Sequence, residues 1–136
     1  MNDEERLQEI NEVLSELSEL AMDRILLVEG PRDKDALNAL GIIGRTYMVQ
    51  SEGGPLKASE FVAENGNKAV ILTDWDRKGG TIASDLSRNL SALGAEYDTS
   101  IRSRLSMLCK KYIKDVESLD SLVERMTSDI SGILRE

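Results

Sequence analysis

Hydrophobic positions near the start of the chain repeat at steps of three and four residues. Over residues 4–21 they place apolar side chains on one face of a helix and acidic side chains on the other. The repeating apolar positions are Leu7, Ile10, Leu14, Leu17 and Ala21. This spacing predicts an amphipathic helix that packs on a core and keeps its acidic face in solvent.

After this helix the pattern changes to short aliphatic runs that alternate with helical stretches. The runs predict strands over residues 24–28, 46–50, 68–73 and, more weakly, 95–98. The helices expected around them cover residues 33–40, 56–65, 81–93, 100–112 and 119–134. This alternation predicts an α/β fold with a four-stranded parallel sheet, right-handed crossovers and helices on both faces.

Polar residues near the helix boundaries suggest how two of these helices begin. Asp33 is expected to cap the helix that follows the first strand. Ser121 and Glu124 match a capping box, placed either at the start of the last helix or one turn inside it.

The chain length favours a single domain. The 136 residues suffice for one hydrophobic core, so residues 1–136 are expected to form one unit. Residues 24–98 would be the α/β core, flanked by an N-terminal helix in 1–23 and a helical extension in 99–136. The acidic N-terminus differs from a secretory signal and the aliphatic runs are too short to span a bilayer, so a cytoplasmic protein without membrane contact is expected.

The residue composition excludes several kinds of chemistry. The chain has no histidine and one cysteine, Cys109. It therefore has no Ser-His-Asp or Cys-His arrangement, no cysteine-rich zinc site and no intrachain disulfide. Carboxylate, hydroxyl and carbonyl oxygens remain as metal ligands, and these favour Mg²⁺ or Mn²⁺.

The net charge of −8 is unevenly distributed. Residues 1–22 contain seven acids and one arginine, a net charge of −6. The stretch 102–114 contains no acid and five basic residues, which are Arg102, Arg104, Lys110, Lys111 and Lys114. This stretch is either a contact for a nucleic-acid backbone or a solvated helix face.

Acidic side chains follow two of the predicted strands directly. Glu29 follows the first strand, and Asp74 and Asp76 follow the third. Ligands of open parallel sheets bind beyond the carboxyl ends of the strands, so adjacent first and third strands would bring the three carboxylates together. Such a cluster favours a divalent cation. Taken singly, each acid could instead form a turn or cap a helix.

Two segments containing these acids resemble motifs of the Toprim family. Val28-Glu-Gly-Pro-Arg-Asp33 is similar to its first motif, and Asp74-Trp-Asp-Arg-Lys-Gly79 is similar to its second, Asp-x-Asp-x-x-Gly. The resemblance covers roughly residues 24–98 and implies a three-layer, Rossmann-like Toprim fold. In size and in Lys114-Asp-Val-Glu117 the chain also resembles small, stand-alone Toprim proteins of archaea, which are uncharacterised.

The resemblance also implies a metal site. It makes Glu29 a metal ligand or a general acid/base, and it makes Asp74 and Asp76 ligands of one or two Mg²⁺ ions, for which Mn²⁺ can substitute. In this reading all three residues are catalytic.

Five further residues are candidates for binding phosphate or substrate. Gly30 and Gly79 match small residues that let the backbone approach phosphate, and Asp33 matches an acid of the first motif. Arg77 and Lys78 could neutralise charge on phosphate or could be ordinary exposed side chains.

Two functions agree with these residues. One is Mg²⁺-dependent phosphodiester chemistry on RNA or DNA, of the nuclease or nucleotidyl-transfer type. The other is a non-catalytic Mg²⁺-binding module that contacts nucleic acid or protein. Topoisomerases and primases of the family need further domains that 136 residues do not accommodate. A homodimer or a larger nucleic-acid-processing complex is compatible with both functions.

Overall fold

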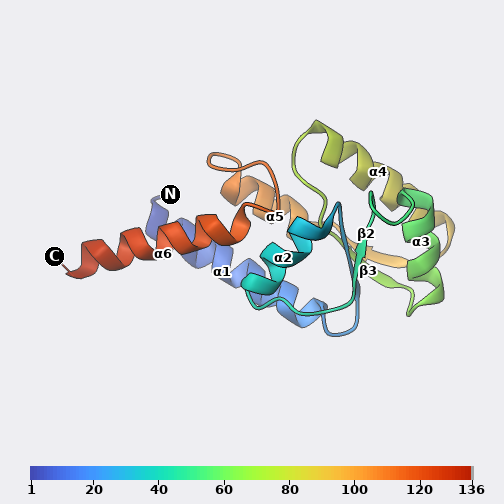
Figure 1. The fold of residues 1–136 in the computed structure, drawn as a ribbon, viewed down its shortest axis with the longest axis horizontal. Coiled ribbons are helices and arrows are strands. Elements are labelled where there is room, and N and C mark those ends of the chain that lie inside the picture. The colour runs from blue at the N-terminus through green and yellow to red at the C-terminus, as the bar shows by residue number, and fades with distance from the viewer. Residues whose placement is uncertain (136) are drawn as a thin grey trace.

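A four-stranded parallel sheet lies at the centre of the protein (Figure 1). The computed structural model describes residues 1–135, with side chains through residue 132, so Glu136 lies outside the described residues. The strands are β1 (Ile25–Val28), β2 (Thr46–Met48), β3 (Lys68–Ile71) and β4 (Glu96–Asp98). Their order in the sheet is β2-β1-β3-β4, which confirms that the first and third strands are adjacent.

Helices cover both faces of this sheet, as the alternating pattern predicts. They are α1 (Asp3–Leu20), α2 (Pro31–Ala39), α3 (Pro55–Glu64), α4 (Arg77–Ala92), α5 (Ser100–Cys109) and α6 (Leu119–Arg135). In Figure 1, α1, α2, α5 and α6 lie on one side of the sheet and α3 and α4 on the other. The expected α/β class is therefore confirmed.

Alternate residues of the buried strands point to the two helical layers. Leu26 and Val28 pack with the layer that contains α1, whereas Ile25 and Leu27 pack with the layer of α3 and α4. Because both faces are covered, every side chain of β1 is buried. This explains why the strands appear in the sequence as continuous aliphatic runs.

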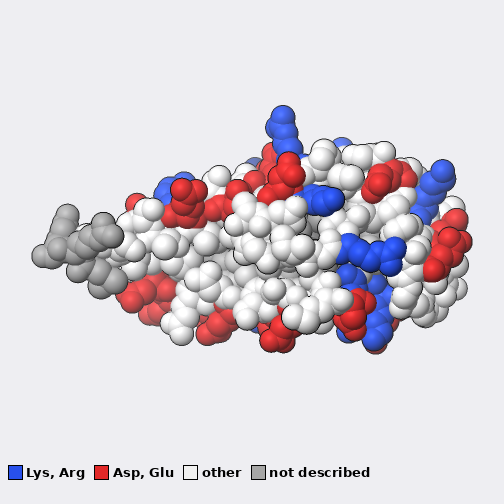
Figure 2. Space-filling view, turned by 60° about the horizontal axis from the view of Figure 1, so that its bottom comes forward, with Lys and Arg blue, Asp and Glu red and all other residues white. Residues whose placement is uncertain are grey.

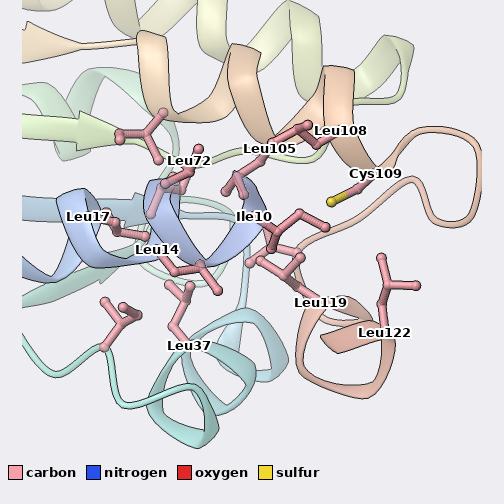
Figure 3. Packing of buried hydrophobic residues seen from close by; sticks show 14 of the residues in the cluster. Ile10, Leu14, Leu17, Leu37, Leu72, Leu105, Leu108, Cys109, Leu119 and Leu122 are labelled. Carbon is pink, nitrogen blue, oxygen red and sulfur yellow. The ribbon is translucent and has the colours of Figure 1, made fainter. Parts of the chain in front are cut away.

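The N-terminal helix α1 is part of the core. Figure 3 shows Ile10, Leu14 and Leu17 among residues of α2, α5 and the start of α6. Ile10 and Leu17 have no exposed surface. In Figure 2 acidic side chains predominate near the end of the molecule next to the grey residues, whereas most of the visible basic side chains lie over the middle and the opposite end, among further acids. No helix in the described part of the chain is long and apolar enough to cross a membrane.

Two helix starts differ from the sequence prediction. Gly30 is the N-cap of α2, so Asp33 lies in the first turn rather than at the cap. Helix α4 begins at Arg77, earlier than predicted, because the Asp76 carboxylate accepts a hydrogen bond from Gly79 N and starts the helix despite two glycines. Helix α6 begins at Leu119, as predicted, and Ser121 lies inside its first turn, which agrees with the second of the two placements considered for Ser121 and Glu124.

The connections between strands create a crevice at the carboxyl ends of β1 and β3. The chain leaves β1 through α2 toward β2, and it leaves β3 through α4 toward β4 on the other side. Helices α2 and α4 pack on opposite faces of the sheet. Adjacent strands whose connections diverge in this way leave the ligand-binding gap typical of open α/β sheets.

Candidate functional site

Glu29 and Asp74 meet in this crevice although they are 45 positions apart in the chain. Glu29 directly follows β1, is only 8% exposed, and accepts a hydrogen bond from the backbone N–H of Asp74 at 2.7 Å. Oδ1 of Asp74 accepts a second bond from the backbone N–H of Val116 at 3.0 Å. The two predicted residues are therefore neighbours at the switch point of the sheet.

Burial and mutual repulsion make it costly to ionise both carboxyl groups. Burial is the main cause that raises the pKa of Glu29 to about 7, and the nearby charges of Asp74 and Asp76 raise it further. Burial also raises the pKa of Asp74, although its bonds with Val116 N and Glu29 oppose that shift. Glu29 is thus the group that holds a proton near neutral pH, as a general acid/base requires.

Asp76 is oriented differently from the expected three-carboxylate cluster. Its Oδ1 accepts a hydrogen bond from Gly79 N at 2.7 Å, and the residue is exposed at the start of α4. It remains close enough for its charge to affect Glu29 and Asp74. The helix cap, which the sequence pattern does not reveal, accounts for this orientation.

Asp33 is buried and fixes the backbone of the first motif. Its Oδ2 accepts hydrogen bonds from Glu29 N at 3.2 Å and Gly30 N at 3.0 Å. Burial raises the pKa of Asp33 to about 6, and the charge of Asp74 adds to this shift. Asp33 therefore positions Glu29 through the main chain, whether or not it also contacts a ligand.

The two motif glycines have different structural surroundings. A Cβ on Gly79 would lie 1.8 Å from the carbonyl oxygen of Asp74, so this position cannot accept a side chain without displacing the loop. A Cβ on Gly30 would meet nothing within 4 Å. Gly79 is thus required for the close packing of α4 on the end of β3, and Gly30 leaves open space at the crevice.

Four exposed cations belong to segments next to the acidic pair. Arg77 and Lys78 are exposed in the first turn of α4, and Arg32 is exposed at the start of α2. Lys114 is also nearby, since its carbonyl oxygen accepts a hydrogen bond from Trp75 N at 3.1 Å. Within the described residues none of these four side chains forms an ion pair. They remain available to an anionic ligand.

A cavity of about 360 Å³ opens at the acidic pair. It is lined by Glu29, Gly30, Pro31, Arg32, Asp33, Gln50, Ser51, Asp74 and Glu117. Sequence reasoning did not identify Gln50, whose Nε2 donates to Glu29 Oε1 at 3.3 Å, or Glu117. Gln50 is the last residue of the second predicted strand, so the rule that ligands bind at strand ends could have found it. Glu117 has no comparable signal.

Residues of the basic stretch 102–114 do not form one free surface. Arg102 donates to backbone carbonyls beside the site, and Arg104 pairs with Glu16 of α1. Trp75 packs against the core beside α1, and its Nε1 donates to Ile113 O at 2.8 Å. Cys109 is fully buried in that core.

A larger hollow of about 700 Å³ lies at the opposite edge, where the strands begin. Its arginines already have partners, since Arg24 pairs with Glu96 and Arg45 donates to Asn65. At the carboxyl edge, Glu29 and Asp74 form no ion pair with any described side chain. This edge is therefore the stronger candidate site.

The acidic pair fits a weakly held hard cation better than a preformed metal cage. In the part of the chain that the structure describes, no group of three or more His, Cys, Asp or Glu side chains is arranged to hold a metal ion. Mg²⁺, however, is commonly held by one or two carboxylates together with water and substrate phosphates. Glu29 and Asp74 match this pattern, with oxygen donors that repel each other in the absence of a cation.

Comparison with known proteins identifies close relatives. The chain is 42% identical over 122 residues to a UPF0292 protein of Methanosarcina barkeri, which covers 89% of this chain and 85% of that protein. A UPF0292 protein of Methanocaldococcus jannaschii is 30% identical over 92% of this chain and 98% of its own length. These relatives are small archaeal proteins, and their names state no activity.

A solved structure supports the fold. A protein from Aquifex aeolicus superposes with a TM-score of 0.67 at 26% identity, over 79% of this chain and 95% of that one. No family model matches the chain, so the Toprim resemblance stays a prediction. The extent and identity of the archaeal matches show that the chain belongs to the UPF0292 family.

Proposed function

We propose that this protein carries out Mg²⁺-dependent phosphodiester chemistry on nucleic acid, as a nuclease or nucleotidyl-transfer enzyme of the Toprim type. The observation that carries the proposal is the meeting of Glu29 and Asp74 at the switch point, where their pKa values are raised. Perturbed carboxyl groups in a crevice are typical of functional sites. The two sequence motifs that resemble Toprim motifs contain these same residues.

Each residue has a role in this proposal. Asp74 would hold the cation, and Asp76 would join it on giving up its bond with Gly79 N. Glu29 would be either a further ligand of the cation or, where it does not bind the ion, the group whose raised pKa lets it give and take a proton at the reacting oxygen. When bound, one or two Mg²⁺ or Mn²⁺ ions supply the activation of water and the neutralisation of phosphate charge.

The exposed cations support a nucleic-acid substrate. Arg32 lines the cavity at the acidic pair, and Arg77, Lys78 and Lys114 are exposed in segments next to it. A phosphate backbone could contact these cations while one phosphodiester reaches the carboxylates. Such local contacts do not need a basic protein overall, and the net charge of −8 is largely due to α1.

A non-catalytic Mg²⁺-binding module is the second candidate. It is favoured by the hydrogen bonds that the acids already make, because Asp74 and Asp76 both accept bonds from backbone N–H groups. In that case the cation would shape a surface for nucleic acid or protein without a chemical step. A homodimer or larger complex is compatible with both candidates.

A cleavage panel distinguishes the two. Single- and double-stranded RNA and DNA, labelled at either end, are incubated with the protein in Mg²⁺, Mn²⁺ or EDTA, and binding is measured in parallel. The enzyme proposal expects cleavage or transfer that requires the metal and disappears in Asp74→Asn. If the wild type binds nucleic acid in a metal-dependent way but forms no product, the non-catalytic module replaces the enzyme proposal.

A further inference from the structure

Arg102 extends from α5 to the loop that presents Asp74. Its Nε donates to Thr73 O at 3.0 Å and its Nη2 to Asp74 O at 2.6 Å. Strand β4 ends at Asp98, which is paired with Val70, so it does not reach these two carbonyl groups. The guanidinium thus supplies hydrogen bonds where the neighbouring strand has ended, and it fixes the main chain at the candidate site.

The charge of Arg102 also faces the acidic residues. The side chain is half-buried, and burial lowers the pKa of Arg102, whereas the charges of Glu29, Asp74 and Asp76 oppose that shift and favour the charged form. Arg104, two positions further along α5, instead pairs at the surface with Glu16. Because partial burial reduces screening by solvent, Arg102 interacts with the acidic residues more strongly than an exposed cation would at the same distance.

We propose that Arg102 is a positioning residue that holds the Asp74 loop in place and acts as an internal counter-charge for the acidic pair when no divalent cation is bound. The part that concerns the cation rests on the proposed function, whereas the coupling to the carboxylates does not. Arg102 and the cation compensate the same negative charge. Loss of Arg102 therefore destabilises the protein more without the cation than with it.

A double-mutant cycle in EDTA tests the coupling to the carboxylates. Urea unfolding is measured for the wild type, Arg102→Gln, Glu29→Gln and the double variant at about pH 8, where Glu29 is largely ionised. Arg102→Gln is expected to raise the equilibrium constant for unfolding. The fold increase should be smaller in the Glu29→Gln background than in the wild type, by a factor of at least about two. Arg104→Gln, the matched control on the same helix, should show equal effects in both backgrounds.

If Arg102→Gln is very unstable, the same cycle is measured in sucrose. Sucrose stabilises the folded state of all four proteins, so their unfolding can still be measured. Arg102→Lys retains the charge and should restore most of the coupling. Additive effects of Arg102→Gln and Glu29→Gln would overturn the counter-charge, because hydrogen bonding to the loop alone predicts no dependence on the Glu29 charge.

A magnesium series tests the other half of the proposal. The loss of stability caused by Arg102→Gln should shrink when Mg²⁺ replaces EDTA. One outcome is that Arg102→Gln costs the same stability in Mg²⁺ as in EDTA, while Mg²⁺ stabilises the wild type but not Asp74→Asn. In that case the inference about Arg102 fails and the proposed cation site stands. If the wild type gains no stability from Mg²⁺, the cation site and the shared compensation both fail, and the cycle in EDTA still decides the coupling.

Discussion

Acidic side chains have different surroundings at the two ends of the strands, the amino edge and the carboxyl edge of the sheet. At the amino edge each acid is close to a base, since Asp23 lies 3.5 Å from Lys68 and Glu96 lies 3.0 Å from Arg24. These acids are more than half exposed, and such surface pairs contribute little to stability. The amino edge therefore balances these charges through surface ion pairs.

At the carboxyl edge Glu29 is buried, Asp74 is half-buried, and the two acids are close to one another. Glu29 and Asp74 accept hydrogen bonds from backbone N–H groups, and no described lysine or arginine forms an ion pair with them. Their raised pKa values reflect the cost of this arrangement. The difference between the edges supports the proposal that the carboxyl edge binds a cation.

The largest expected effect concerns activity. On a nucleic acid that the wild type cleaves, Glu29→Gln should lower the rate by about 10²-fold or more, because the amide keeps the shape but cannot bind a proton or a cation in the same way. Glu96→Gln, at the amino edge, serves as the control and should retain full activity. Equal activity of Glu29→Gln and wild type would remove the basis for the proposed mechanism.

The next effect concerns the loop between β3 and α4. Gly79→Ala should destabilise the protein by about 2–3 kcal/mol, because its Cβ would overlap the carbonyl of Asp74. Gly30→Ala, where the space is open, should change stability by less than about 1 kcal/mol. Urea denaturation measures both. Similar losses would show that the two motif glycines are not distinguished by this contact.

Added Mg²⁺ should stabilise the carboxyl edge. At about tenfold excess over its dissociation constant, the ion should add about 1.4 kcal/mol and raise the melting temperature by a few degrees. Asp74→Asn should gain much less, and Glu96→Gln as much as wild type. An identical rise in the wild type and Asp74→Asn would assign the effect to other carboxylates.

A pH effect should follow from the raised pKa values. The folded state holds protons on Glu29 up to about pH 7 and on Asp33 up to about pH 6, above their ordinary values of 4.5 and 3.8. Their contribution to stability in EDTA is therefore complete at low pH and is lost as the pH rises through these ranges.

For Glu29 this loss should be roughly 1–2 kcal/mol, since the site keeps some solvent. Chemical denaturation between about pH 4 and pH 8 measures it against Glu29→Gln, which should lack that share. A difference between the two proteins that does not vary with pH would contradict the raised pKa of Glu29.

The smallest expected effect concerns the exposed rim. Arg77→Ala and Lys78→Ala should each weaken nucleic-acid binding only a few-fold and reduce its dependence on salt concentration, because neighbouring cations share the phosphate contacts. Titrations at several salt concentrations measure both quantities. A loss as large as that of Glu29→Gln would place these side chains at the reacting phosphate itself.

Local patterns were sufficient to predict most of the secondary structure. The repeat of α1 and the aliphatic runs of β1 and β3 reflect burial along the chain, and the structure reproduces these elements within a few residues. Helix starts were less predictable, as α4 shows. There a single side-chain bond from Asp76 outweighs the tendency of two glycines to form a loop.

The sequence by itself determined the order of the elements, the apolar faces that form the core, and the acids at the ends of two buried strands. The tertiary structure decided that Glu29 lies against Asp74, that Asp76 turns to cap α4, and that Arg102 and Val116 hold the Asp74 loop. Periodicity records which side of an element is buried, whereas these contacts join residues 28 to 45 positions apart or depend on a side-chain rotamer. Such contacts leave no local pattern, so only the packed chain defines the site.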